Sequence, residues 1–240
     1  MALEYKATDL PGKILYPKEF SIQIRSITPI EQKYILSLSQ KEQKTNRDYV
    51  NFLKKLVMID NPQMTFEELY WFDVQYLLYR IRYLTYPKHP IKLGFKCQNC
   101  GEPVEQSLDM GALEIDTPEN VQTTIVLDNL GEFKIRNKLM QDDITIEEFS
   151  KKMNFDMEDL QLRLLLLDLC LISDNGRKIE ELYSLAEQGE ITADDIFKVE
   201  KWFETNIWGV KERVNITCPH CQKEASRGYL LSIEDFFSIV

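Results

Sequence analysis

The sequence has few of the residues on which catalytic sites depend. It contains 2 histidines in 240 residues, so a Ser/His/Asp or Cys/His arrangement has few possible members. Neither a glycine-rich phosphate loop nor a nucleophile elbow occurs in it. The acidic pairs, such as Asp142 with Asp143 and Asp194 with Asp195, stand at predicted helix starts, where carboxylates complement the helix dipole. We therefore predict that the chain is not an enzyme and has no small-molecule substrate.

A long hydrophobic run is also missing. The longest, at 160–172, includes Arg163 and Asp168 and falls short of the roughly 20 residues that span a bilayer. The first residues lack the basic start and apolar core of a signal peptide. We expect no membrane partner and a cytoplasmic location, in which cysteines stay reduced.

Positive charge is scarce relative to negative charge. The chain has 29 Lys and Arg against 39 Asp and Glu, which gives a net charge of −10. Because nucleic acids are polyanions, proteins that bind them usually present a basic face. The best short basic cluster here is only Arg80 with Arg82. We therefore expect no nucleic-acid partner, whereas protein partners are compatible with this charge.

Four of the 5 cysteines form two Cys-x-x-Cys pairs, Cys97 with Cys100 and Cys218 with Cys221. Strands are predicted on both sides of each pair, at 91–96, 104–108, 210–216 and 224–230. Two thiolates on such a turn fill half of a tetrahedral zinc site, and Gly101 suits the positive φ that the first turn needs. Four thiolates leave no open position for catalysis, so we predict one structural Zn²⁺ bound by both pairs.

The long separation of the two pairs is the unusual feature of this prediction. There are 117 residues between Cys100 and Cys218, and a comparable cross-link stabilises a fold by about 4–5 kcal/mol in the chain-entropy model. The alternatives are four free thiols or a redox pair, but a thioredoxin-like pair needs a helix that starts at its first cysteine. His220 could replace a cysteine ligand, although we expect it to face solvent because four thiolates suffice. We expect Cys170 to be a buried core cysteine.

Hydrophobic periodicity predicts an α+β fold in which helices dominate and the strands form short β-hairpins. Besides the strands around the cysteines, a strand is expected at 20–24 and a hairpin at 121–127 and 132–135. Helices are expected at 29–39, 49–58, 65–84, 157–173, 179–188 and 192–206. Capping boxes are expected at Thr28/Glu31, Thr65/Glu68 and Thr145/Glu148.

The predicted elements fit a single domain of residues 1–240, because neither a repeat nor a flexible Gly/Ser linker divides the chain. Residues 1–90 would supply the N-terminal strand and helices. Residues 91–116 and 210–230 would form a split zinc ribbon, with a four-cysteine site shared between its halves. Residues 117–209 would be a hairpin and helical block inserted between those halves.

Aromatic residues are dense at 66–86, where eight of them occur on one predicted helix. They cannot all face one core, so we expect some of them at the surface, where Tyr and Trp suit protein interfaces. The alternative is a helix that is buried on two sides. The apolar C-terminal segment, with Phe236 and Phe237, either docks on its own domain or inserts into a neighbour.

Three further stretches of the sequence resemble motifs of a known protein family. The first is 10–13 (LPGK) with Tyr16, followed by 22–28 (IQIRSIT) and Glu31. The second is 79–86 (YRIRYLTY), and the third is 95–101 (FKCQNCG) directly after it. Together they resemble the T4-type bacteriophage baseplate proteins, a family of hub-assembly proteins of contractile tails.

The likeness covers residues 1–115 and the second cysteine pair. It departs from the family pattern at Gly12, where serine is expected, and at Pro87, where many members have glycine. No catalytic residues carry over from the family. The four cysteines carry over as metal ligands.

The resemblance implies a non-enzymatic structural or assembly protein of the tail baseplate hub. Its partners would be baseplate hub proteins and the tape-measure protein. It would be found in the virion tail baseplate, or in the host cytoplasm during assembly. The cysteine pattern alone leaves an alternative, a zinc-ribbon nucleic-acid-binding or transcription factor, which the net charge of −10 opposes.

Overall fold

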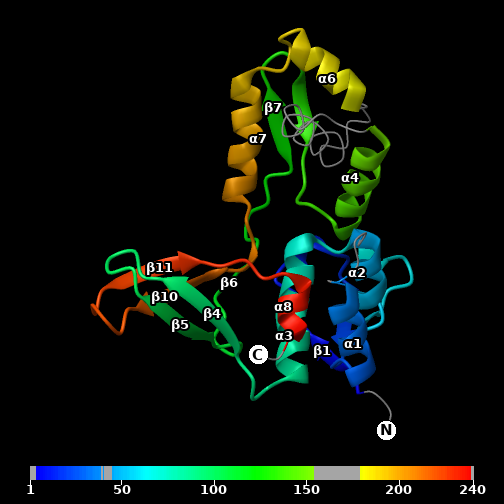
Figure 1. Ribbon diagram of the computed structural model, residues 1–240. Helices are drawn as coiled ribbons and strands as arrows, with labels where there is room; N and C mark the ends of the chain where they lie inside the picture. Colours follow the sequence, from blue (N-terminus) through cyan, green and yellow to red (C-terminus); the bar gives the residue numbers. More distant parts are fainter. Residues whose placement is uncertain (1–3, 39, 41–44, 154–178, 239–240) are drawn as a thin grey trace.

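The computed structural model describes residues 4–38, 40, 45–153 and 179–238. Helices and short antiparallel strands form three parts, which we call the body, the arm and the upper lobe (Figure 1). The body is built mainly from the N-terminal residues, the arm from the two segments that contain the cysteines, and the upper lobe from the stretch between those segments. This is the α+β class that the sequence predicts.

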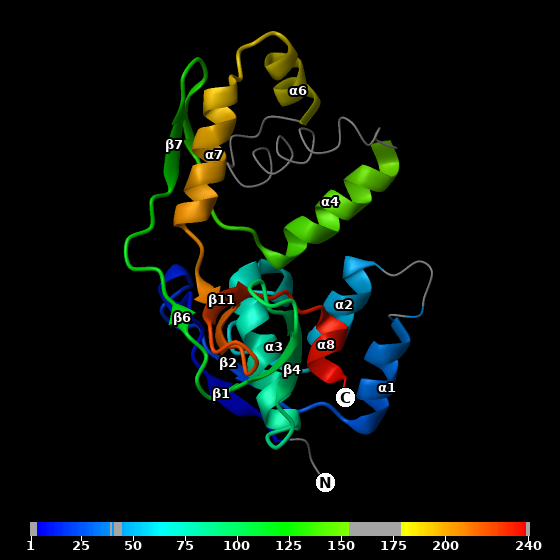
Figure 2. The same ribbon diagram turned by 60° about the vertical axis from the view of Figure 1, so that its left-hand side comes forward.

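The body surrounds one long central helix. Its elements are β1 (Lys6–Thr8), β2 (Ile22–Ile24), α1 (Pro29–Leu38), α2 (Asn46–Leu53), β3 (Val57–Ile59), η2 (Phe66–Glu68), α3 (Trp71–Thr85) and α8 (Ile233–Phe237). The three strands form one antiparallel sheet in the order β1-β2-β3. Figures 1 and 2 show α8 lying between α3 and the pair α1 and α2. The C-terminal helix is therefore part of the body core.

The apolar C-terminal segment docks on its own domain. The ring of Phe236 lies 4.7 Å from that of Tyr79 in α3, and the ring of Phe237 lies 5.7 Å from that of Phe52 in α2. Both phenylalanines are fully buried. The backbone carbonyls of Phe236 and Ser238 also accept hydrogen bonds from the guanidinium of Arg82, which is itself buried.

The aromatic stretch at 66–86 belongs to a helix that is buried on most of its sides. Phe66, Phe72 and Tyr79 are buried, and of the eight aromatic residues only Tyr83 is exposed. Of the two alternatives, a helix buried on two sides describes most of the stretch, and Tyr83 is the aromatic side chain at the surface. The physical reason is that α3 packs against the strands on one side and against α8 on another, so both apolar faces are covered by the chain itself.

The N-terminal motif is explained by a contact across the body. The backbone N–H of Gly12 donates to Asp73 Oδ1 at 2.9 Å, and the hydroxyl of Tyr16 donates to Asp73 Oδ2 at 2.8 Å. A Cβ atom at Gly12 would lie 2.5 Å from Asp73 Oδ2 and 2.8 Å from the ring of Phe72. A side chain at position 12 would therefore force Asp73 or Phe72 to shift, because the chain approaches α3 so closely here.

Asp73 should make the stability of the body depend on pH. Burial raises the pKa of its carboxyl group to about 7, and the N–H of Gly12 and hydroxyl of Tyr16 only partly oppose that shift. Since the folded-state pKa lies above the unfolded value of 3.8, the folded state binds the proton more tightly. The contribution of Asp73 to the free energy of unfolding is therefore fully present below the unfolded-state pKa, and it is lost as the pH rises through about 7.

We expect Asp73→Asn to flatten this dependence, because an amide does not titrate. Urea unfolding at pH 5 and at pH 8 measures this dependence. The urea midpoint of the wild type should be lower at pH 8 than at pH 5, and the midpoint of the variant should decrease less. The control is Asp60→Asn, at an exposed aspartate, which should keep the wild-type difference. An unchanged difference in Asp73→Asn would show that Asp73 is not the titrating group.

The second motif forms the start of α1. The guanidinium of Arg25 donates two hydrogen bonds to Glu31, at 2.9 and 2.7 Å. Glu31 also accepts from the backbone N–H of Thr28, and its own N–H donates to the Thr28 hydroxyl. The bond from Arg25 lowers the pKa of Glu31 to about 2. The capping box predicted here is confirmed, and the buried side chains of Ile35 and Leu38 form the inner face of the helix.

Helices α2 and α3 differ most from the sequence prediction, and α2 begins at Asn46 and not at 49. Helix α2 ends at Leu53 and not at 58, because 57–59 pairs with β2 as strand β3. The Thr65/Glu68 capping box is confirmed, but it opens the short turn η2, and α3 begins only at Trp71. The chain changes direction between the two, where the N–H of Trp71 donates to the carbonyl of Lys138.

The upper lobe has a hydrophobic core of its own. Its elements are β7 (Thr124–Leu127), β8 (Gly131–Lys134), α4 (Met140–Met153), α6 (Ile179–Glu187) and α7 (Ala193–Thr205). Leu127, Phe133, Leu182 and Val199 are buried in this core. Helix α4 packs on both cores, because its Met140 and Ile144 are buried in the body core whereas Ile146 and Phe149 pack against the core of the lobe. The predicted hairpin and the two helices after residue 178 are confirmed. The predicted leucine-rich helix at 157–173, with Cys170, lies outside the described residues.

The third predicted capping box, Thr145/Glu148, is wrong. Helix α4 already begins at Met140, where the side chain of Asp142 accepts from the N–H of Leu139. Thr145 therefore lies inside the helix, and its hydroxyl donates to the carbonyl of Gln141. Among the described helices, none has the length and hydrophobicity that crossing a bilayer requires.

Candidate metal centre

Two β-hairpins form the arm. Strand β4 (Ile91–Lys96) pairs with β5 (Pro103–Leu108), and β10 (Arg213–Thr217) pairs with β11 (Glu224–Gly228), both antiparallel. All four strands match the predicted ones to within a few residues. Val104 and Ile216 are buried between the hairpins, with Phe95 and Val214 packed against them. The short pair β6 (Ile115–Asp116) and β9 (Gly209–Val210) joins the two chain segments that lead to and from the upper lobe.

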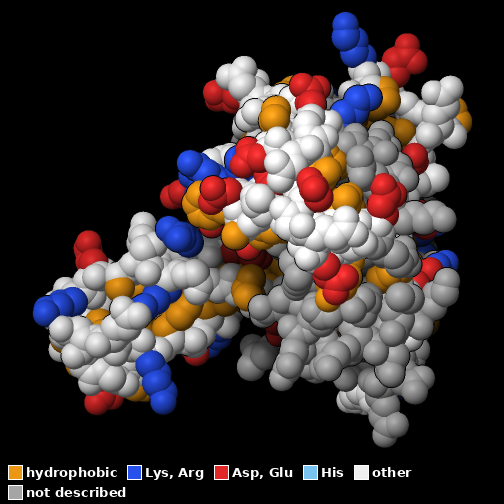
Figure 3. All heavy atoms as spheres, turned by 90° about the horizontal axis from the view of Figure 1, so that it is seen from above, with side chains coloured by type: hydrophobic (Ala, Val, Ile, Leu, Met, Phe, Trp, Pro, Cys, Tyr) orange, Lys and Arg blue, Asp and Glu red, His pale blue; other side chains and the backbone are white. Residues whose placement is uncertain are grey.

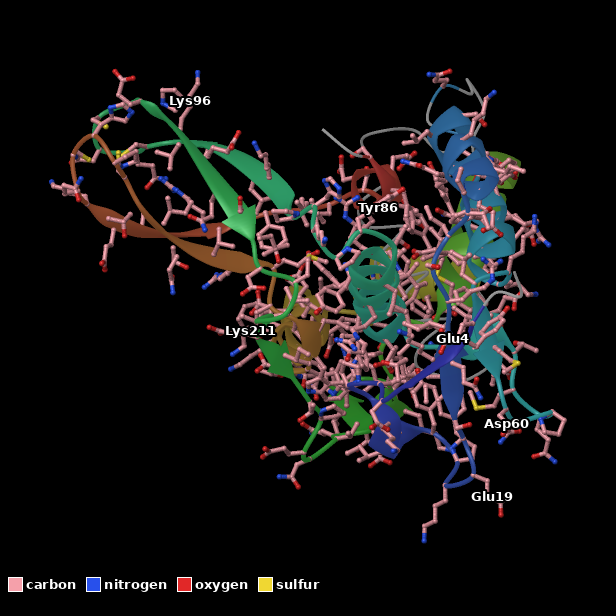
Figure 4. The ribbon with its side chains drawn as sticks, turned by 90° about the horizontal axis from the view of Figure 1, so that it is seen from below. Glu4, Glu19, Asp60, Tyr86, Lys96 and Lys211 are labelled. Atoms are coloured by element: carbon pink, nitrogen blue, oxygen red, sulfur yellow. The ribbon has the colours of Figure 1, made fainter. Side chains whose placement is uncertain are left out.

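The four predicted ligands come together at the far end of the arm. The Sγ atoms of Cys97 and Cys221 are 3.7 Å apart, and those of Cys100 and Cys218 are also 3.7 Å apart. All four Sγ atoms lie within 4.8 Å of one another. Figure 4 shows the sulfur atoms gathered at the tip of the arm, near Lys96. Cysteines that are 118 and 124 positions apart in the sequence thus meet in one cluster.

The two cysteine turns share one backbone pattern. In each turn the N–H of the first cysteine donates to the carbonyl five residues later, and its carbonyl accepts from the N–H four residues later. These bonds are Cys97 N to Glu102 O at 2.9 Å, Gly101 N to Cys97 O at 2.9 Å, Cys218 N to Lys223 O at 3.0 Å and Gln222 N to Cys218 O at 2.9 Å. The turns therefore present their sulfur atoms in equivalent ways.

The fifth residue of each turn has positive φ. Gly101 has a φ of 78°, as the sequence predicts, and Gln222 at the same place in the second turn has a φ of 57°. Gln222 is the one non-glycine residue with positive φ among those that the structure describes. No signal in the sequence marks it, because its conformation is imposed by the turn and not by glycine. The sequence also did not reveal the bond from Lys223 Nζ to Asn99 Oδ1, 2.8 Å long, which ties the two turns together.

Gly101→Ala should destabilise the arm by about 1–2 kcal/mol, because an L-residue with a side chain is strained at positive φ. Gly94→Ala is the matched control: Gly94 lies in the same hairpin, has no positive φ, and an added Cβ would meet nothing within 4 Å. Its effect should stay within about 0.5 kcal/mol. Thermal unfolding of both variants measures the difference, and equal melting temperatures would contradict the proposed turn strain.

The spacing of the sulfur atoms fits a four-thiolate metal site. A tetrahedral ion with Zn–S bonds of about 2.3 Å holds its sulfur atoms about 3.8 Å apart, and the two facing pairs here are 3.7 Å apart. A disulfide requires about 2.05 Å, so these four cysteines are free thiols. No helix starts at Cys97, where β5 follows the turn, so the redox geometry expected of a thioredoxin-like pair is missing here.

The electrostatic surroundings favour thiolates in part of the cluster. The backbone N–H groups of Cys100 and Asn99 lower the pKa of Cys97 to about 6, and the N–H of Lys223 lowers that of Cys221. The backbone N–H of Glu102 lowers the pKa of Cys100. Desolvation and the neighbouring sulfur atoms outweigh that effect and raise this pKa to about 12. Four sulfur atoms this close share protons, and a divalent cation would replace those protons.

The remaining candidate residues stay outside the cluster. His220 lies within the second turn and is exposed, in agreement with the expectation that it faces solvent. The only group of three or more potential metal ligands found among the described residues is the four cysteines themselves. These four residues can hold one metal ion, and the carboxylates of the acidic pairs do not join them.

A comparison with known proteins identifies a matching family. A family model described as T4 bacteriophage base plate protein matches residues 3–238. The match extends beyond the residues 1–115 and the second cysteine pair that carry the resemblance in the sequence, and it includes the whole upper lobe. Searches of the curated proteins and of the solved structures found no match.

Proposed function

Because this chain belongs to the T4 bacteriophage base plate protein family, we propose that it is a non-enzymatic structural or assembly protein of the baseplate hub of a contractile phage tail. The observation that carries the proposal is the match over residues 3–238, nearly the whole chain. Family membership implies interaction with other phage proteins and points to the virion tail. The hub proteins and the tape-measure protein are the proposed partners.

We further propose that Cys97, Cys100, Cys218 and Cys221 bind one structural Zn²⁺. The support is the cluster of four sulfur atoms within 4.8 Å of one another, a ligand set that zinc prefers and that leaves no open position. The ion would join the two hairpins of the arm into a split zinc ribbon. It would thereby tie together two segments of the chain that enclose the upper lobe, in keeping with a single domain of residues 1–240.

The charge of the arm argues against the nucleic-acid alternative. Residues 91–108 and 211–228 contain six basic residues (Lys92, Lys96, Lys211, Arg213, Lys223 and Arg227) and four acidic ones (Glu102, Glu105, Glu212 and Glu224), so 6 − 4 = +2. One Zn²⁺ with four thiolates contributes −2. The metal-loaded arm is then neutral, whereas a zinc ribbon that binds nucleic acid needs a net basic face.

Co-expression tests the function. The chain would be produced together with each hub protein, and with the tape-measure protein, of the phage that encodes it. We expect at least one of these proteins to co-elute with it at a fixed ratio in size-exclusion chromatography. If none co-eluted, and the chain instead shifted the mobility of DNA in a salt-dependent way, the proposal would fail and the zinc-ribbon nucleic-acid-binding function would replace it.

A further inference from the structure

The net charge of the chain is confined to one of its parts. Residues 117–209, which contain the upper lobe, hold 20 of the 39 acidic residues and 10 of the 29 basic ones, so their net charge is 10 − 20 = −10. The remaining residues hold 19 of each and are neutral. Figure 3 shows acidic side chains spread over the upper lobe, with apolar side chains among them. The net negative charge of the protein is therefore carried by residues 117–209.

Helix α7 presents an uncovered face of this lobe. Val199 and Trp202 bury the inner side of the helix against the core of the lobe. Phe197 lies on the outer side and is 59 % exposed, although it is one of the largest apolar side chains. Ile207, 69 % exposed, follows directly after the end of the helix. A phenylalanine in this position contributes nothing to the core of the lobe.

Charged residues follow Phe197 on the same face, where the exposed Lys201 lies between the acidic Glu200 and Glu204. Glu200 and Glu204 are exposed, and they lie one helical turn apart, three and seven positions after Phe197. Neither makes an ion pair with another residue of the described chain. In contrast, other acidic residues of the lobe are paired: Asp128 with Lys198, Asp142 with Arg136, and Glu148 with Arg47. Like charges four positions apart disfavour a helix, and no ion pair of Glu200 or Glu204 offsets this repulsion among the described residues.

We propose that the outer face of α7 binds a lysine- and arginine-rich surface of another baseplate protein, with Phe197 as the apolar anchor of the contact. The charge of the lobe selects a basic partner, because complementary potentials steer association and suppress wrong partners. A large aromatic side chain surrounded by polar residues is the arrangement found at the energetic centre of protein interfaces. This inference rests on the proposed function, since it takes the partner from among the baseplate proteins.

The experiment measures binding of the full-length chain to the hub proteins and the tape-measure protein of the same phage, by isothermal titration calorimetry at low and at high salt. The test variants are Phe197→Ser and the double charge reversal Glu200→Lys with Glu204→Lys. The matched control is Glu19→Lys with Asp60→Lys, which makes the same charge change at two exposed acidic residues of the body, both labelled in Figure 4. Melting temperatures of all variants establish that they are folded.

We expect each test variant to weaken binding of one partner at least about tenfold, and the control to bind like the wild type. The affinity of the wild type should fall with salt, and the charge reversal should remove most of that dependence.

If the wild type bound a hub protein and the α7 variants bound it equally well, the inference would be overturned while the proposed function stood. If the wild type bound none of the proteins, both would fall. Self-association of the wild type that the charge reversal abolished, with hub binding unchanged, would identify a second copy as the occupant and would also overturn the inference.

Discussion

The Cys218→Ser variant is expected to melt roughly 6–12 °C below the wild type. Cys218 is the buried member of the cluster, and its Sγ atom faces that of Cys100 at 3.7 Å. Serine is a poor zinc ligand, so the substitution would leave three thiolates and release the link between the two hairpins. Measured losses of a cross-link often fall short of the roughly 4–5 kcal/mol of the chain-entropy model, so we expect a loss of about 3 kcal/mol. Each kcal/mol shifts the melting temperature of a chain of this size by about 2–4 °C.

The control for this prediction is His220→Ser, which changes an exposed residue of the same turn. It should melt within about 2 °C of the wild type, because four thiolates complete the site without it. A chelator should lower the melting temperature of the wild type and of the control, but it should have little further effect on Cys218→Ser. Equal melting of Cys218→Ser and wild type, in the presence of zinc, would show that the arm is held without metal.

The second large effect is expected for Phe237→Ala, which should destabilise the protein by about 3–5 kcal/mol. Phe237 is 0 % exposed, and its ring packs on that of Phe52. The alanine variant would leave a cavity at the junction of α8 with α1 and α2, which the surrounding helices cannot fill. Chemical unfolding measures this loss as a lower midpoint with an unchanged slope.

Leu230→Ala is the matched control, because Leu230 stands a few residues earlier in the same C-terminal segment but is 88 % exposed. Its effect should stay within about 0.5 kcal/mol. If Phe237→Ala were as mild as this control while its binding to baseplate proteins was lost, the C-terminal segment would be a partner-binding element that docks only loosely on its own domain. That result would support the alternative hypothesis, in which the C-terminal segment inserts into a neighbouring protein.

The parts of the fold that depend on local patterns could be predicted from the sequence. The cysteine turns are an example, because strand, Cys-x-x-Cys and Gly101 follow one another within a few residues. The capping boxes at Thr28 and Thr65 are another, since each involves residues only three positions apart. The same local reasoning failed at Thr145, because the start of α4 is fixed from outside. There the N–H of Met140 donates to the carbonyl of Leu69, a residue far away in the sequence.

Such local patterns could not predict contacts between residues that are far apart in the sequence. The sequence shows that Gly12 and Tyr16 belong to a motif, but their partner Asp73 lies 61 and 57 positions away. The burial of the aromatic helix depends on α8, which comes from the other end of the chain. For the metal centre, the ligands could be named, whereas the positive φ of Gln222 and the bond between Lys223 and Asn99 depend on how the two turns face each other.

In the proposed metal centre, one ion is shared by two cysteine turns from distant parts of the chain. Native mass spectrometry of the purified protein, paired with elemental analysis, tests this arrangement most directly. One zinc ion per chain is expected in the wild type, and loss of that ion is expected in Cys218→Ser. A metal-free protein with four titratable thiols, or two ions bound independently by the two turns, would contradict it.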